Sequence, residues 1–282
     1  MNMSEYKTDL PVLLEAGSKQ NKTPPLRLKL SHGLILAAVL VMSTGVAHSA
    51  ADPAAVSIFD VLLRWMPLLL NGFMFNIIIS ICAMAIGTLV GAALGLGQIS
   101  LNGVTRRSSW FITQFFRNSP WLVLLFFAMF LLPFEIRIGS VIIPLPDWLK
   151  AIVGLSLPVM ANVSEIVRGA VISLPSGQWE AAESLAYTRT QTLWRIILPQ
   201  CVKRMLPPWM NLYSILTMAT VLASIVGVSE VMTLTGQALA AEGGRPDLLM
   251  PFYSFVLLIF FIYCYPIARW TVYLEKKFAV KG

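Results

Sequence analysis

Five long apolar segments limit the folds open to this chain more than any other feature of its sequence. Their approximate ranges are 68–97, 120–132, 148–171, 208–232 and 249–272. All except the second reach the roughly 17–25 residues that a helix needs to cross a bilayer, and the apolar run 110–116 can extend the second at the membrane interface. In lipid, a helix satisfies all of its own backbone polar groups. The pattern therefore predicts an all-α, polytopic transmembrane helical bundle with five core helices.

The composition excludes a charged, soluble surface. Hydrophobic residues make up 57% of the chain and charged residues 12%, against a norm of about 25% for charged residues. The net charge of +7 could point to nucleic acid, but the basic residues are dispersed among the apolar segments. We therefore predict membrane lipid, and no nucleic acid, as a partner. The three cysteines and two histidines lack the spacing of a disulfide framework or a metal site.

The N-terminal region lies outside the five-helix core. Residues 1–30 are polar and basic and contain Pro24-Pro25, which predicts a disordered cytoplasmic tail. Residues 31–50 are apolar and end in small residues, so they form either a first transmembrane helix or a cleaved, signal-like segment. The long leader before them favours a retained helix. The predicted membrane domain itself covers residues 60–277.

One long polar run, Gly177 to Gln200, interrupts the apolar segments and has a helical pattern, so it must lie outside the lipid. Ser176 is placed to cap a first helix. After a break at Ala186-Tyr187, Thr188 to Gln191 has the spacing of a capping box, which begins a second helix. Residues 175–200 are therefore predicted to form a helix–turn–helix loop that projects from the membrane domain.

This loop and several motifs around it resemble one family of membrane proteins. The loop contains Glu180-Ala181-Ala182, Leu185 in the next turn and Leu198-Pro199-Gln200 near its end. The other motifs are Arg117-Asn118-Ser119-Pro120, Glu165-Ile166-Val167-Arg168-Gly169, Gly177-Gln178, and Leu206-Pro207 with Asn211. Together they resemble importer-type ABC transporter permeases of the polar amino acid group, such as the histidine-, glutamine- and glutamate-type permeases. The resemblance covers roughly residues 60–277.

The chain departs from this family at two places. Ala186 stands where the family usually has glycine, a residue that adopts a left-handed backbone more readily. Met218, Thr220, Val221 and Leu222 stand where the family usually has a lysine ahead of a Thr-Ser-Leu-like run.

The resemblance implies a transport subunit of an ATP-driven importer in the bacterial inner membrane, and not an enzyme. Such a permease pairs with a second permease subunit, identical or homologous, and rests on an ABC ATPase subunit dimer. A periplasmic binding protein delivers the polar amino acid. The chain has no P-loop motif, so we expect it to hold no cofactor and the partner ATPase to bind ATP and Mg²⁺. The alternatives are a stand-alone secondary transporter or channel, and an accessory or signalling membrane protein.

On this resemblance, the loop makes the contact with the ATPase. Small residues permit close approach, and the Glu180 carboxylate can meet a basic residue of the partner. The candidate ATPase-coupling residues are Glu180, Ala181, Ala182, Leu185, Ala186, Leu198 and Pro199.

A cytoplasmic loop would also fix the topology. Helix alternation then places residues 1–29, residues 100–118 and the segment after residue 272 on the cytoplasmic side. The basic residues predicted to lie on the opposite side are Arg64, Arg137, Lys150 and Arg245. This distribution follows the positive-inside rule, so both termini are predicted to be cytoplasmic.

Polar residues within the apolar segments are the candidates for a substrate pathway. They are Asn162, Glu165, Asn211, Ser214, Thr217, Thr220 and Ser224. An ionisable residue in a membrane helix by default indicates a polar pathway or a partner, but Arg168 follows Glu165 at a spacing that permits a simple ion pair. The helical hydroxyls could equally bond back to their own carbonyls or join neighbouring helices.

Three glycines recur every fourth residue in the first core helix, at Gly87, Gly91 and Gly95. They make a smooth face that another helix can approach closely. We expect this face to pack within one subunit rather than to form a dimer seam.

Overall fold

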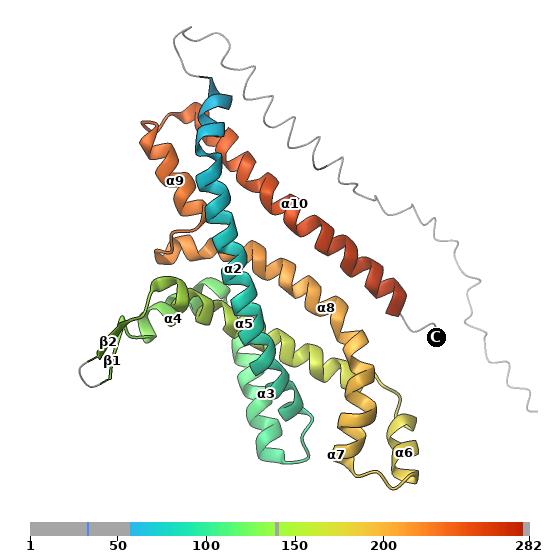
Figure 1. The fold of residues 1–282 in the computed structure, drawn as a ribbon. Helices are drawn as coiled ribbons and strands as arrows, with labels where there is room; N and C mark the ends of the chain where they lie inside the picture. The colour runs from blue at the N-terminus through green and yellow to red at the C-terminus, as the bar shows by residue number, and fades with distance from the viewer. Residues whose placement is uncertain (1–32, 34–56, 139–140, 279–282) are drawn as a thin grey trace, which may run out of the picture.

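The computed structural model describes residue 33, residues 57–138 and residues 141–278, and its long helices form one bundle (Figure 1). Four helical stretches of these residues are long and apolar enough to cross a membrane. They are α2 (Ile58–Gln98), α5 (Asp147–Ile172), the continuous stretch Arg189–Val226 and α10 (Pro246–Phe278). The all-α prediction is therefore confirmed, while the predictions for residues 1–30 and 31–50 fall, apart from Gly33, outside the described residues.

The second predicted span, 120–132, is the shorter arm of a broken helix, and the apolar run 110–116 lies in the other arm. The helices α3 (Gly103–Arg117) and α4 (Trp121–Leu131) meet at an angle of 106°. Pro120 has an extended backbone and no N–H, which ends the first helix. Asn118 Nδ2 donates to the Gln114 carbonyl at 2.7 Å, and Ser119 Oγ donates to the Phe115 carbonyl at 2.7 Å. The Ser119 bond takes the place of a helical partner at Phe115, and the Asn118 bond adds to the helical bond that the Gln114 carbonyl accepts from the Asn118 N–H at 3.1 Å.

The glycine face of α2 packs against α5, which confirms the prediction of close packing within one subunit. A Cβ at Gly87 would lie 2.5 Å from Val159 Cγ1, and one at Gly91 would lie 2.5 Å from the backbone oxygen of Met160. Only glycine permits this approach. In Figure 1, α3 runs beside the same half of α2.

A short hairpin connects α4 to α5. Its strands are β1 (Glu135–Ile138) and β2 (Val141–Pro144), which pair antiparallel. The fully buried Lys150 of α5 places its ammonium 3.6 Å from the centre of the Phe134 ring at the base of the hairpin. This cation–π contact fixes the hairpin to the start of α5.

The predicted span 208–232 is also broken, and its prediction as a single helix was wrong. The helix α8 (Leu198–Ala219) continues as a 3₁₀ turn, η2 (Thr220–Val226), and a new helix, α9 (Val231–Ala241), follows. Gly227 between them has a φ of 90°, which a glycine adopts without strain. Glu230 caps α9 by accepting from the backbone N–H groups of Met232 and Thr233. A glycine and a capping carboxylate thus end the span earlier than hydropathy suggests.

The remaining elements belong to the loop between α5 and α8. They are α6 (Gly177–Ser184), α7 (Arg189–Thr192) and a π-helical turn, η1 (Leu193–Ile197). In Figure 1, α6 and α7 lie at one end of the molecule and α9 lies toward the other.

Candidate functional site

The loop is held against the ends of α5 and α8 by a small apolar cluster. Its buried members are Ala170, Val171, Leu174, Ile197 and Cys201, and Trp179 and Leu193 pack against them. Ala182 of α6 is also buried, at 2% exposure. Hydrophobic burial therefore anchors the inner face of the loop to both membrane helices.

The turn between α6 and α7 has left-handed backbone at Ala186, with a φ of 58°. The Tyr187 N–H donates to the Ala182 carbonyl at 3.1 Å, and the Ala186 N–H donates to the Glu183 carbonyl at 2.9 Å. These two bonds define a Schellman motif, in which glycine is the usual left-handed residue. The predicted break is confirmed, and alanine occupies a position that favours glycine.

The predicted capping box at the start of the second helix is confirmed. Thr188 N–H donates to Gln191 Oε1 at 2.9 Å, and Gln191 N–H donates to Thr188 Oγ1 at 3.3 Å. The predicted cap at Ser176 is wrong, because its backbone is helical and its side chain forms no capping bond. Pro175 lets the helical conformation begin one residue earlier, since its carbonyl accepts from the Gln178 N–H at 3.1 Å.

The candidate coupling residues divide between two faces of the loop. Glu180, Ala181, Ala186 and Pro199 are exposed, and Leu185 is 71% exposed. Ala182 is buried, and Leu198 is half-buried and packs against the apolar cluster. Trp194, at 59% exposure, was not predicted as a contact residue. The sequence feature that could have indicated it is a large aromatic residue within the polar run Gly177–Gln200, which was predicted to lie outside the lipid.

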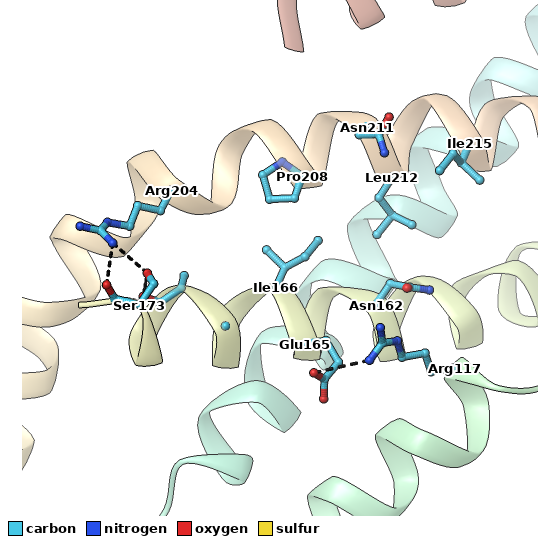
Figure 2. A pocket seen from close by; sticks show the side chains of 12 residues that line it. Arg117, Asn162, Glu165, Ile166, Ser173, Arg204, Pro208, Asn211, Leu212 and Ile215 are labelled. Atoms are coloured by element: carbon cyan, nitrogen blue, oxygen red, sulfur yellow. Dashed lines mark hydrogen bonds and ion pairs between the residues drawn. The ribbon is translucent and has the colours of Figure 1, made fainter. Parts of the chain in front are cut away.

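A polar cavity of about 490 Å³ lies between α5 and α8, beside the end of α3 (Figure 2). Of the predicted pathway residues it contains Asn162, Glu165 and Asn211, joined by Arg117 and Arg204. Figure 2 shows α8 along one wall and α5 along the opposite wall. Arg204 Nη1 bridges these helices by donating to the Ser173 carbonyl at 2.8 Å and to Ser173 Oγ at 2.9 Å.

Glu165 is held between two arginines rather than by one. Its carboxylate accepts from Arg168 Nη2 at 2.7 Å, as the spacing predicted, and lies 3.6 Å from Arg117 Nη1. Gln114 Nε2 donates to Glu165 Oε1 at 3.3 Å. These bonds join α3 to α5 at the cavity. Sequence reasoning missed the Arg117 partner, because the pair crosses from one helix to another.

The other four predicted pathway residues do not line this cavity. Ser214, Thr217 and Thr220 are buried, and Ser224 lies in η2. The hydroxyls of Thr217, Thr220 and Ser224 donate to carbonyls of their own helical stretch, those of Tyr213, Thr217 and Val221.

A second buried polar cluster joins the middle of α2 to the start of α9. Asn76 Nδ2 donates to Glu230 Oε2 at 2.8 Å and to Thr220 Oγ1 at 2.9 Å, while Asn76 Oδ1 accepts from the Val231 N–H at 3.1 Å. Asn76, Thr220 and Glu230 are all fully buried. Sequence reasoning missed this cluster, although an asparagine within the first apolar segment was a signal for it.

Comparison with known proteins identifies close relatives of this chain. The family model described as binding-protein-dependent transport system inner membrane component matches residues 87–280. The chain is 34% identical over 210 residues to the inner membrane amino-acid ABC transporter permease protein YhdY of Escherichia coli K12, spanning 74% of this chain and 56% of that relative. It thus spans about half the length of this relative.

A shorter relative is matched over most of its length. The probable amino-acid ABC transporter permease protein YckA of Bacillus subtilis 168 is 34% identical over 214 residues, which cover 76% of this chain and 90% of YckA. Among solved structures, the crystal structure of an amino acid ABC transporter with histidines has a TM-score of 0.67 at 20% identity. That match covers 79% of this chain and 99% of the other, and it shows a shared fold.

Proposed function

Because the chain belongs to the family of binding-protein-dependent transport system inner membrane components, we propose that it is the permease subunit of an ATP-driven importer for a polar amino acid. Its similarity to YhdY and YckA, both named as amino-acid ABC transporter permeases, supports this function. The same similarity favours an importer subunit over the stand-alone secondary transporter or channel. In this proposal the chain carries out transport and a separate ATPase subunit binds and hydrolyses ATP.

The partners follow from this assignment. The exposed face of the loop contacts an ABC ATPase dimer, a second permease subunit completes the membrane domain, and an external binding protein delivers the amino acid. The loop and both termini then lie on the cytoplasmic side of the inner membrane, in accord with the distribution of basic residues.

The observation that carries the mechanism is the unbroken helical connection between the loop and the cavity. From Arg189 to Val226 the chain is one continuous helical stretch of 38 residues, although it changes from α- to π- to α- to 3₁₀-helix. Its first turns belong to the loop, and its later turns, through Pro208 and Asn211, line the polar cavity. A displacement of the loop by the ATPase therefore moves a wall of the cavity as a rigid element.

The cavity has the properties of a section of a substrate pathway. It offers amide groups from Asn162 and Asn211 and a carboxylate that two arginines already hold. Neutral amides can exchange hydrogen bonds with a passing polar solute without stranding a buried charge. We propose that Asn162 and Asn211 contact the substrate, and that Glu165 positions α3 against α5.

The test is purification of the tagged chain from its own membranes in mild detergent, followed by mass spectrometry and uptake assays. We expect an ATPase to co-purify with the wild type and to be lost or weakened with Glu180→Lys, together with uptake. Glu275→Lys, an exposed charge reversal on α10, is the matched control and should retain both. If no ATPase co-purifies with the wild type in any detergent, the importer proposal fails and the stand-alone transporter becomes the favoured function.

A further inference from the structure

A second large cavity lies where α8, α2 and α10 meet, on the opposite face of α8 from the polar cavity. It has a volume of about 510 Å³, and α8 lines it with Leu206, Trp209 and Tyr213, whereas Pro208, Asn211 and Ile215 of the same helix line the polar cavity. At 100° per residue these two sets point in opposite directions. The floor includes the buried Met84, and the rim includes Trp270, at 60% exposure, so the cavity is an open groove.

The groove is lined mainly by apolar side chains, and the polar tips that α8 contributes already have partners. Trp209 Nε1 donates to Thr88 Oγ1 at 2.9 Å, and the hydroxyls of Tyr213 and Tyr263 lie 2.7 Å apart in a hydrogen bond. A polar solute in this groove would lose more hydrogen bonds to water than the lining could replace. The chemistry of the groove therefore suits a hydrocarbon chain.

The lining becomes cationic one helical turn further along the same two helices. A cavity of about 350 Å³ there is lined by Lys203 and Arg204 of α8 and by Phe278 of α10. Lys203 precedes Leu206 by three residues, and Phe278 follows Leu274 of the apolar groove by four. The change from hydrocarbon to cation thus occurs over about 5 Å, the rise of one helical turn.

These two cations have no carboxylate partner within the described part of the chain. Arg204 lines the polar cavity on the opposite face of α8, where it bonds to the carbonyl and hydroxyl of Ser173, so Lys203 is the cation on the groove side. Neither residue forms an ion pair within the described part of the chain. Glu275 is the carboxylate of this part of α10, and it forms no ion pair with either. The end of the groove therefore has an uncompensated positive charge that complements an anion.

We propose that this groove binds an anionic phospholipid, with an acyl chain between α8 and α10 and the phosphate on Lys203. The order of apolar and cationic surface along the helices matches the order of chain and headgroup in such a lipid. Leu206 to Tyr213 spans roughly 10 Å at the rise of an α-helix, enough for about half of an acyl chain. The loop side of the membrane, where Lys203 lies, is also the leaflet in which anionic lipid attracts basic residues.

The test is native mass spectrometry of the intact complex in mild detergent, titrated with phosphatidylglycerol or with phosphatidylcholine of the same acyl chains. We expect one phosphatidylglycerol to bind each copy of the chain more tightly than phosphatidylcholine. Lys203→Gln should weaken phosphatidylglycerol binding about fivefold, the factor for one cation near a membrane surface, and leave phosphatidylcholine binding unchanged. Lys203 is exposed, so this variant should fold normally.

A steric variant tests the acyl-chain part of the site. Ala85 lines the groove on α2, and Ala85→Phe should reduce the binding of both lipids several-fold. Val90→Phe, a similar substitution at an exposed α2 position that does not line the groove, should bind like the wild type. Equal affinity of the wild type for the two lipids would overturn the proposal. A second pair of results would also overturn it: no lipid bound to the wild type, together with loss of a permease subunit from the Ala85→Phe variant. The groove would then be an interface between subunits.

Discussion

Gly91→Ala tests the close approach of α2 and α5. An alanine Cβ at this position would lie 2.5 Å from the backbone oxygen of Met160 and 2.8 Å from Val163 Cβ. Ordinary contact begins at 3.4 Å, so the helices must separate by about 0.9 Å, the difference between 3.4 and 2.5 Å. Overpacking of this kind costs about 1–3 kcal/mol. We expect the midpoint of thermal unfolding in detergent to fall by several degrees.

A second glycine-to-alanine substitution distinguishes the cost of overpacking from the gain in helix propensity. Gly236→Ala in α9 adds the same methyl group at a helical position with no atom within 4 Å. It should stabilise the fold by about 0.5–1 kcal/mol, because alanine favours the helix more than glycine does. A Gly91→Ala variant as stable as the wild type would refute the reasoning from close approach.

Double variants identify which neighbour creates the cost. At Gly87 the nearest atoms belong to the Val159 side chain, at 2.5 and 2.7 Å, so Val159→Ala should relieve part of the strain of Gly87→Ala. At Gly91 the nearest atom is a backbone oxygen, which no substitution removes, so Val163→Ala should relieve little of the strain of Gly91→Ala. A double-mutant cycle on thermal stability measures this difference in coupling.

Three further predictions follow from single side chains. Ala186→Gly should stabilise the fold by up to about 1 kcal/mol, because φ at this position is left-handed; thermal unfolding tests this, and lost stability or uptake would show a turn built around alanine. Asn76→Leu should lower the free energy of unfolding by about 3 kcal/mol or more, because it removes hydrogen bonds from the buried Glu230 carboxylate and the Val231 N–H. A yield in detergent and a melting point equal to those of the wild type would contradict this. Glu165→Gln should reduce uptake without loss of co-purified ATPase, because it weakens the ties to α3 but leaves the loop intact; unchanged uptake would remove its positioning role.

The parts of the structure that sequence could predict are those in which a few adjacent residues decide the conformation. The break at Ala186 and the capping box of Thr188 are local, and both are confirmed. The glycine face of α2 was predictable because its spacing is regular, although the identity of the α5 atoms against it was not. The Glu165–Arg168 pair follows from helical spacing in the same way.

The broken helices could not be predicted from hydropathy. An apolar run has the same hydropathy whether it is straight or bent by 106°, as α3 and α4 are. The sequence signal is instead a residue that ends a helix, such as proline or glycine. Beside it stands a polar side chain that can bond to the free backbone groups at the helix end. Ser119 does this at the end of α3, and Glu230 does it at the start of α9. In lipid, no water can replace such side chains.

The second break also decides how far a displacement of the loop can travel. The helical stretch from Arg189 ends at Val226, where the left-handed Gly227 separates it from α9. At this end Asn76 of α2 holds both the last turns of the stretch, through Thr220, and the start of α9, through Glu230 and Val231. The α2–α5 glycine contact holds α2 in place. On the proposed function, α8 therefore acts as the moving element between a driven loop and a fixed frame. The polar cavity lies between that moving helix and α5, where a change in the tilt of α8 alters its width most directly.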